Sequence, residues 1–176
     1  MIINERETRH NHLINVAKQI MTAARTAPKG KGVDLLEIIA VEGEDIAALA
    51  DKTRQLGEET NQQFMLRDAI NIQSAEVVIL IGTRQSNQGL NCAYCGYPTC
   101  AEKPNPVPCA INSVDVGIAI GSACSMAADL RVDSRVMFSV GFAAHKLGRL
   151  EGCSTVIAIP LSASSKNPFF DRKIEV

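Results

Sequence analysis

The spacing of apolar residues predicts helices in the first half of the chain. Within residues 6–25, apolar side chains recur at intervals of three and four and so share one helical face: Leu13, Val16, Ala17, Ile20, Met21 and Ala24. Pro28 and the glycines of APKGKG should end this helix. Two more helices are expected over residues 45–55 and 63–72.

Short apolar runs predict the strands. DLLEIIAV (residues 34–41) and EVVILIG (76–82) are rich in Leu, Ile and Val, and a glycine ends the second. RVMFSV (135–140) and STVIAIPL (154–161) predict two more strands, with a short helix, FAAHKLG, between them. Helices and strands thus alternate, which predicts an α/β or α+β protein with a layered central sheet.

The region between the second strand and the next helix differs from the rest. From residue 83 to residue 108 the chain is rich in Gly, Pro, Asn and Cys and has no periodicity. A loop of this length inside a compact domain is normally functional. The long helix INSVDVGIAIGSACSMAADL (111–130) should follow, with Asn112 or Ser113 as its N-cap.

Composition narrows the class of protein. The 176 residues (1–176) fit a single domain, with 46% hydrophobic and 21% charged residues. Lys plus Arg number 18 against 19 for Asp plus Glu, without a long basic run, so we expect no nucleic-acid partner. The N-terminal region is charged, and the longest apolar run, VVILI, is too short to span a bilayer. We therefore expect a cytoplasmic protein that does not enter a membrane and keeps its thiols reduced.

Cysteines are the main candidates for chemistry. NCAYCGYPTC (91–100) holds three of the six cysteines, and the spacing Cys92-x2-Cys95-x4-Cys100-x8-Cys109 supplies four thiolates from one loop. Four thiolates complete a [4Fe–4S] cluster, with one cysteine for each iron. A structural zinc site is the rival, although such sites usually present two C-x2-4-C pairs. A thioredoxin-like pair would leave two thiols without a role, and disulfides are uncommon in reducing compartments.

The other reactive residues carry less signal. Cys124 on the long helix and Cys153 before the last strand are expected to be buried, unmodified and apart from the cluster. His10, His12 and His145 have no ligand-type neighbours at a suitable spacing. The sequence contains no Walker loop, G-x-S-x-G elbow, H-E-x-x-H or G-x-G-x-x-G motif.

Two family resemblances add to this picture. NCAYCGYPTC with Cys109 resembles the C-x2-C-G-x3-C core of four-iron, four-sulfur domains, and the whole chain resembles the ferredoxin-domain-containing DUF2148 proteins. The segments around residues 20–43, 115–148 and 156–173 are similar to flavin-dependent nitroreductases. This second resemblance implies an α+β, nitroreductase-like fold, a layered central sheet flanked by helices, with residues 83–110 as an inserted iron–sulfur loop.

The nitroreductase resemblance also implies a flavin. Carried over by position, FMN would lie beside Ala27, Pro28 and Lys29, and its phosphate would be approached by Arg172 or Lys173. The chain departs from that family at two points of the flavin site: the arginine-rich opening is reduced here to Arg6 and Arg9, and Leu35 and Leu36 replace the Trp or similar residue expected after the Ala-Pro loop.

The resulting expectation is a redox protein with one [4Fe–4S] cluster. With FMN bound it would be an oxidoreductase that exchanges electrons between cluster and flavin, and without FMN an electron carrier or sensor with an unidentified redox partner. The alternative is a zinc-stabilised binding module that is not an enzyme. The resemblance further implies a homodimer, and the small residues of the long helix suit a close helix contact: Gly117, Ala119, Gly121, Ala123 and Ala127. The other interpretation is that this helix is the core helix of one subunit.

Overall fold

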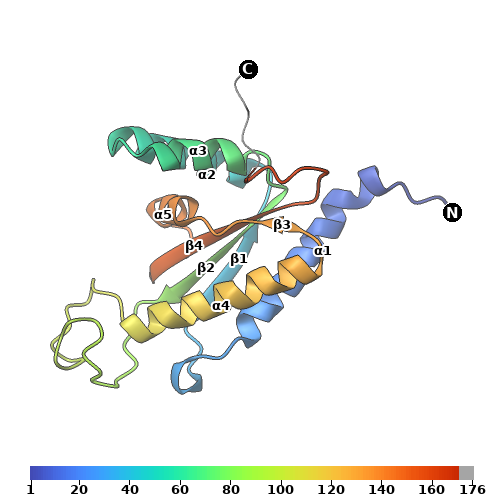
Figure 1. Cartoon of the computed structure of the whole chain (residues 1–176). Coiled ribbons are helices and arrows are strands. Elements are labelled where there is room, and N and C mark those ends of the chain that lie inside the picture. Colours follow the sequence, from blue (N-terminus) through green and yellow to red (C-terminus); the bar gives the residue numbers. More distant parts are fainter. Residues whose placement is uncertain (171–176) are drawn as a thin grey trace.

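The computed structural model describes residues 1–170 and shows a four-stranded sheet with helices on both faces (Figure 1). The sequence order of the elements is α1 (Glu5–Thr26), the short 3-10 turn η1 (Gly30–Gly32), β1 (Leu36–Val41), α2 (Glu44–Glu59), α3 (Gln63–Ile72), β2 (Val77–Arg84), α4 (Ala110–Asp129), β3 (Asp133–Ser134), α5 (Phe138–Lys146) and β4 (Cys153–Ser162). The strand order across the sheet is β1-β2-β4-β3, and every neighbouring pair is antiparallel.

The central strand β2 shows why the sheet has two cores. Its side chains alternate between the faces, as in any strand. Val77, Ile79 and Ile81 pack with α1 and α4 in one apolar cluster. Val78 and Leu80 pack with α2 and α5 in another. Residues 77–83 of the strand are buried throughout, so both faces of the sheet are covered (Figure 1).

Helix α4 packs along α1 on one face of the sheet. Its buried side includes Ala119, Ala123 and Ala127, all at 0% exposure. Among the described residues, α4 is the one helix long and apolar enough to cross a membrane by length and composition, with a mean hydropathy of 1.3 over its best window. Core helices of water-soluble proteins meet the same criterion, so this property is weak evidence for a membrane.

The predicted strand over residues 135–140 is wrong. Met137 makes a single bridge to Ala158, its N–H donating to the Ala158 carbonyl over 2.9 Å, and helix α5 begins at the next residue. The buried residues that follow, including Val140 and Ala144, share a helical face. Gly141 allows this helix to lie directly on β4, because a Cβ there would come 2.3 Å from the Val156 carbonyl oxygen. A short apolar run fits either structure, and packing decided for the helix.

The other predicted elements are present, with shifted ends. Helix α3 has the predicted bounds, and α2 extends four residues beyond the expected end at Gln55, to Glu59. Helix α4 begins at Ala110, so its N-cap position is Cys109 and not Asn112 or Ser113. This shift places a cysteine at the start of the helix, which matters for the site.

Candidate functional site

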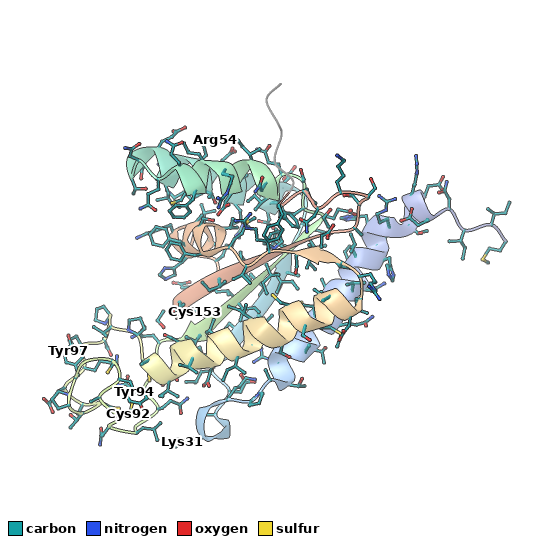
Figure 2. All side chains as sticks on the ribbon, in the orientation of Figure 1. Lys31, Arg54, Cys92, Tyr94, Tyr97 and Cys153 are labelled. Atoms are coloured by element: carbon teal, nitrogen blue, oxygen red, sulfur yellow. The ribbon has the colours of Figure 1, made fainter. Side chains whose placement is uncertain are left out.

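The segment from Gln85 to Cys109, here called the cysteine loop, joins β2 to the start of α4 without any helix or strand. It extends beyond the sheet at the N-terminal end of α4 (Figure 1). Figure 2 shows Cys92, Tyr94 and Tyr97 on this loop, with Lys31 of η1 beside it. All four predicted ligand cysteines therefore come from one segment at one end of the molecule.

Buried amides attach the loop to α4. Gln88 is 5% exposed, and its Nε2 donates to Asn112 Oδ1 over 2.9 Å. Asn112 in turn donates through Nδ2 to the Ser86 carbonyl over 2.8 Å. Asn112 does not act as the predicted N-cap; its side chain instead ties the loop to the first turn of the helix.

The turn η1 supports the same region from the other side. Lys31 Nζ donates to the Gln88 carbonyl over 3.0 Å. The backbone N–H of Gly30 donates to Asp115 Oδ1 over 2.9 Å, and Asp115 is buried on α4. The GKG segment, whose glycines were expected only to end the first helix, therefore links the end of α1 to both the loop and α4.

Side chains of the loop also fix its own backbone around Cys100. The Cys100 N–H donates to Asn91 Oδ1 over 2.9 Å, and Asn87 Nδ2 donates to the Cys100 carbonyl over 3.2 Å. Asn91, Ala93 and Gly96 have positive φ angles of 49°, 60° and 88°. These residues make the tight turns of the loop, and the Gly96 N–H donates to the Ala93 carbonyl over 2.9 Å.

Cys109 has the environment of a stabilised thiolate. Burial by itself raises the pKa of its thiol, but backbone N–H groups of Asn112, Gln88 and Ile111 and the nearby Lys103 ammonium outweigh that effect, so the pKa is lowered. The sulfur also lies at the positive end of a 20-residue helix, which favours negative charge. The sequence pattern did not predict Cys109 at the start of the helix, because it indicated a later start for α4.

The remaining cysteines of the loop are half-buried, and all six cysteines are free thiols. Within residues 1–170, no three Cys, His, Asp or Glu side chains are gathered as a metal-binding group. The fold therefore places Cys92, Cys95, Cys100 and Cys109 on one loop without drawing their sulfur atoms together.

Cys124 and Cys153 do not belong to the cysteine loop. Cys124 lies on α4, whereas Cys153 lies on β4 opposite Arg84, the residue before the loop begins. Cys153 is buried as expected, whereas Cys124 is only half-buried. Burial raises the pKa of both thiols; a hydrogen bond to Ser134 partly offsets this for Cys124. Raised pKa values suit packing rather than ligation or nucleophilic chemistry.

The residues predicted to contact a flavin are only partly described. Ala27 is buried and Pro28 is exposed. Lys29 Nζ donates to the carbonyls of Arg25 and Ala27 over 2.5 and 2.7 Å, so its ammonium caps the end of α1. Arg172 and Lys173 lie outside the described residues.

A polar cavity of about 460 Å³ lies at the N-terminal end of α1, lined by Arg6, Arg9, Ala163, Ser164 and Ser165. It brings the first turns of the chain next to the segment that follows β4. The sequence indicated Arg6 and Arg9 as scattered remnants of an arginine-rich motif; their spacing of three on a helix was the signal that they share a face. Arg9 is paired with Glu5 over 2.6 Å.

Comparison with solved structures defines the class of fold. A nitroreductase with bound FMN from Desulfitobacterium hafniense matches with a TM-score of 0.59 at 16% identity, over 92% of this chain and 85% of that one. A nitroreductase with bound FMN from Bacteroides fragilis matches with a TM-score of 0.61 at 12% identity, over 91% and 82% of the two chains. The chain thus has a nitroreductase-like α+β fold, as expected.

Sequence comparison identifies the family. Residues 105–172 match the family model DUF2148, described as "Uncharacterized protein containing a ferredoxin domain". An uncharacterized protein from Archaeoglobus fulgidus is 38% identical over 186 residues, which cover 98% of this chain and 98% of the relative. The chain belongs to the DUF2148 family. The matched segment includes Cys109 but begins after the other three cysteines of the loop.

Proposed function

We propose that this chain is a cytoplasmic redox protein that holds one [4Fe–4S] cluster on its cysteine loop. Cys92, Cys95, Cys100 and Cys109 are the ligands. The ferredoxin-domain description of the family and the FMN bound by fold neighbours both indicate redox chemistry. The observation that carries the proposal is Cys109, a thiol with a lowered pKa at the start of α4, on the same loop as three further free thiols.

The loop suits a cluster in its donor set and its backbone. Thiolates are the ligands that iron–sulfur clusters require, and the positive φ angles of Asn91, Ala93 and Gly96 give the loop tight turns whose backbone can wrap around a cluster. Hydrogen bonds of Gln88 and Lys31 anchor the start of the loop. The hydrogen bond from the Cys100 N–H to Asn91 Oδ1, by contrast, lies within residues 91–100. Metal sites are rarely preformed without their metal, so cluster binding is expected to draw the four cysteines together.

A second cofactor, FMN, is proposed for the other end of α1. The cavity beside Arg6, Arg9 and Ser164 is polar and next to a helix N-terminus, which suits a phosphate. Arg6 adds a positive charge, whereas the charge of Arg9 is paired with Glu5. Because α1 is 22 residues long, its two ends lie about 30 Å apart, so Ala27 and Pro28 would lie along this flavin only if the partner subunit of the proposed dimer supplies them. Arg172 or Lys173 would assist at the phosphate. Lys29 is engaged with carbonyls of α1, so it would contribute through its backbone more readily than through its ammonium.

The two cofactors would divide the chemistry. A cluster exchanges single electrons, and a flavin accepts or donates two for reaction with a substrate. The chain's own residues hold the cofactors and shield them from water. Without FMN, the same loop serves as an electron carrier that docks an unidentified redox partner.

A homodimer is part of the proposal. The alanines of α4 named above face the core, whereas Gly117 and Gly121 face outward, and a Cβ on either would meet nothing within 4 Å. Val114 and Ile118 lie on the same outward face at 54% and 41% exposure. This apolar face with two glycines suits the close approach of a second copy of α4 across a symmetric interface.

Anaerobic purification with an absorbance spectrum tests the cofactors directly. An iron–sulfur protein is brown, and bound FMN adds a yellow colour with a split peak and is released as a fluorescent flavin on denaturation. A colourless protein with stoichiometric zinc would support the alternative, a zinc-stabilised binding module. A brown protein without flavin would leave the electron-carrier form of the proposal.

A further inference from the structure

Lys103 is a buried lysine within the cysteine loop. The residue is 7% exposed. Its Nζ donates to the Val107 carbonyl over 2.5 Å and to the Pro104 carbonyl over 3.3 Å. Lysine side chains are almost never fully buried unless their charge is paired. A negatively charged group is therefore expected near this ammonium.

The described residues provide no carboxylate for it. None of the ion pairs within residues 1–170 includes Lys103. The adjacent Glu102 is directed to Thr99, whose Oγ1 donates to Glu102 Oε1 over 2.7 Å. The two carbonyls satisfy hydrogen-bond donors of Lys103 but do not neutralise its charge, and a buried unpaired charge is costly.

The candidate for the negative partner of Lys103 is the Cys109 thiolate. Lys103 Nζ is held against the Val107 carbonyl over 2.5 Å, two residues before Cys109 in the chain, which keeps the ammonium near that ligand. Residues 103 and 109 lie on the same loop as the other three candidate ligands. A positive charge is thus buried on the loop between two of the proposed ligands, Cys100 and Cys109.

We propose that Lys103 is the counter-ion of the cluster and raises its reduction potential. This inference rests on the proposed function. Four thiolates outweigh the positive charge of the cluster core, so the bound centre is a net anion. Reduction adds one electron to that anion, and a cation buried in a medium of low dielectric stabilises the reduced form more than the oxidised form.

Lys31 shows why burial matters here. It also contacts the loop, through the Gln88 carbonyl, but it is exposed to solvent. Water and salt screen an exposed charge, so its influence on the potential should be smaller than that of Lys103. The inference therefore concerns a single residue and not the general positive charge around the loop.

Three variants separate charge from structure. Lys103→Gln removes the charge but keeps an N–H donor for the carbonyls, and Lys103→Arg keeps the charge. Lys52→Gln on α2 removes a lysine charge on the other face of the sheet. Iron and sulfide are first measured in the anaerobically purified wild-type protein, and the midpoint potential is then determined for each variant by spectroelectrochemical titration.

The expected result is a lower potential in Lys103→Gln, with Lys103→Arg and Lys52→Gln close to wild type. A Lys103→Gln protein with a full cluster and an unchanged potential would overturn the inference while leaving the cluster proposal intact. A wild-type protein without iron would instead overturn the proposed function. If Lys103→Gln loses its cluster during handling, the rate of iron release to a chelator decides. Faster iron release from the Lys103→Gln protein than from the Lys103→Arg protein supports the role of Lys103 as counter-ion, and equal rates of release contradict it.

Discussion

Gln88 and Asn112 form a buried amide pair that joins the cysteine loop to α4. Gln88 Nε2 donates to Asn112 Oδ1 over 2.9 Å, and the two side chains are 5% and 1% exposed. Asn112 lies three residues after Cys109 in the chain, so the pair fixes the loop close to this candidate ligand. Because both amides are buried, each depends on the other for its hydrogen bonds.

Asn112→Ala is expected to destabilise the protein and loosen the loop. It leaves the Gln88 amide and the Ser86 carbonyl without partners, which costs about 1–3 kcal/mol of unfolding free energy. Urea unfolding measures the loss, and amide hydrogen exchange of residues 85–90 should become faster. Gln55→Ala, which removes an exposed hydrogen bond to Glu59, is the control. Equal stability of the two variants would contradict the assigned anchoring role.

Asp34 should make stability depend on acid pH. Burial raises the pKa of its carboxyl, but hydrogen bonds from Arg25 and from the Leu36 N–H more than offset this, and the pKa in the folded protein is lowered. A carboxyl with a lowered folded pKa stabilises the protein above its unfolded pKa, about 3.9, and loses that contribution as pH falls toward the folded value.

The comparison of Asp34→Asn with wild type tests this effect. The variant is expected to melt at a lower temperature than wild type at neutral pH, and the difference should shrink at an acid pH of about 2, as Asp34 of the wild type becomes protonated. The side chain is 39% exposed, so the difference should be modest. Asp51→Asn on α2 serves as the control. A wild-type advantage that is constant between the two pH values would count against the ion pair as its origin.

Cys124 and Cys153 should not be ligands. Cys124→Ala and Cys153→Ala are expected to retain the iron content of the wild type, because neither residue belongs to the cysteine loop. Cys153 is 5% exposed, so its replacement should cost about 1 kcal/mol through the lost packing. Iron analysis and urea unfolding measure the two effects separately. Stoichiometric loss of iron from Cys124→Ala would show that the ligand set is misassigned.

The proposed dimer predicts a mass near twice the 18.9 kDa of one chain in light scattering. Ile118→Asp places a charge in the centre of the outward face of α4 and should yield monomers, because burying an unpaired charge is costly. Val136→Asp is the control, since Val136 is also exposed, at 47%, but lies outside α4. A wild-type mass of one chain at micromolar concentration would refute the dimer and weaken the case for FMN at a shared site.

Local pattern was sufficient for much of the fold and for the candidate ligands. Helix α3 and strand β2 follow from periodicity and β-branched content, and the cysteine spacing identified the loop. The pairing of Gln88 with Asn112 spans 24 residues and depends on tertiary packing, so the local sequence pattern could not predict it. The same holds for α5, where contact of Gly141 with β4 determined a helix in a run that also suits a strand. The burial of Lys103 likewise depends on how the loop folds back on itself.

The most direct test of the central claim is the content of iron, acid-labile sulfide and zinc per chain in anaerobically purified protein. The account predicts about four iron and four sulfide for each chain, with no stoichiometric zinc. It also predicts loss of that iron in each of the variants Cys92→Ala, Cys95→Ala, Cys100→Ala and Cys109→Ala. One zinc per chain without sulfide, or full iron in the Cys109→Ala protein, would contradict it.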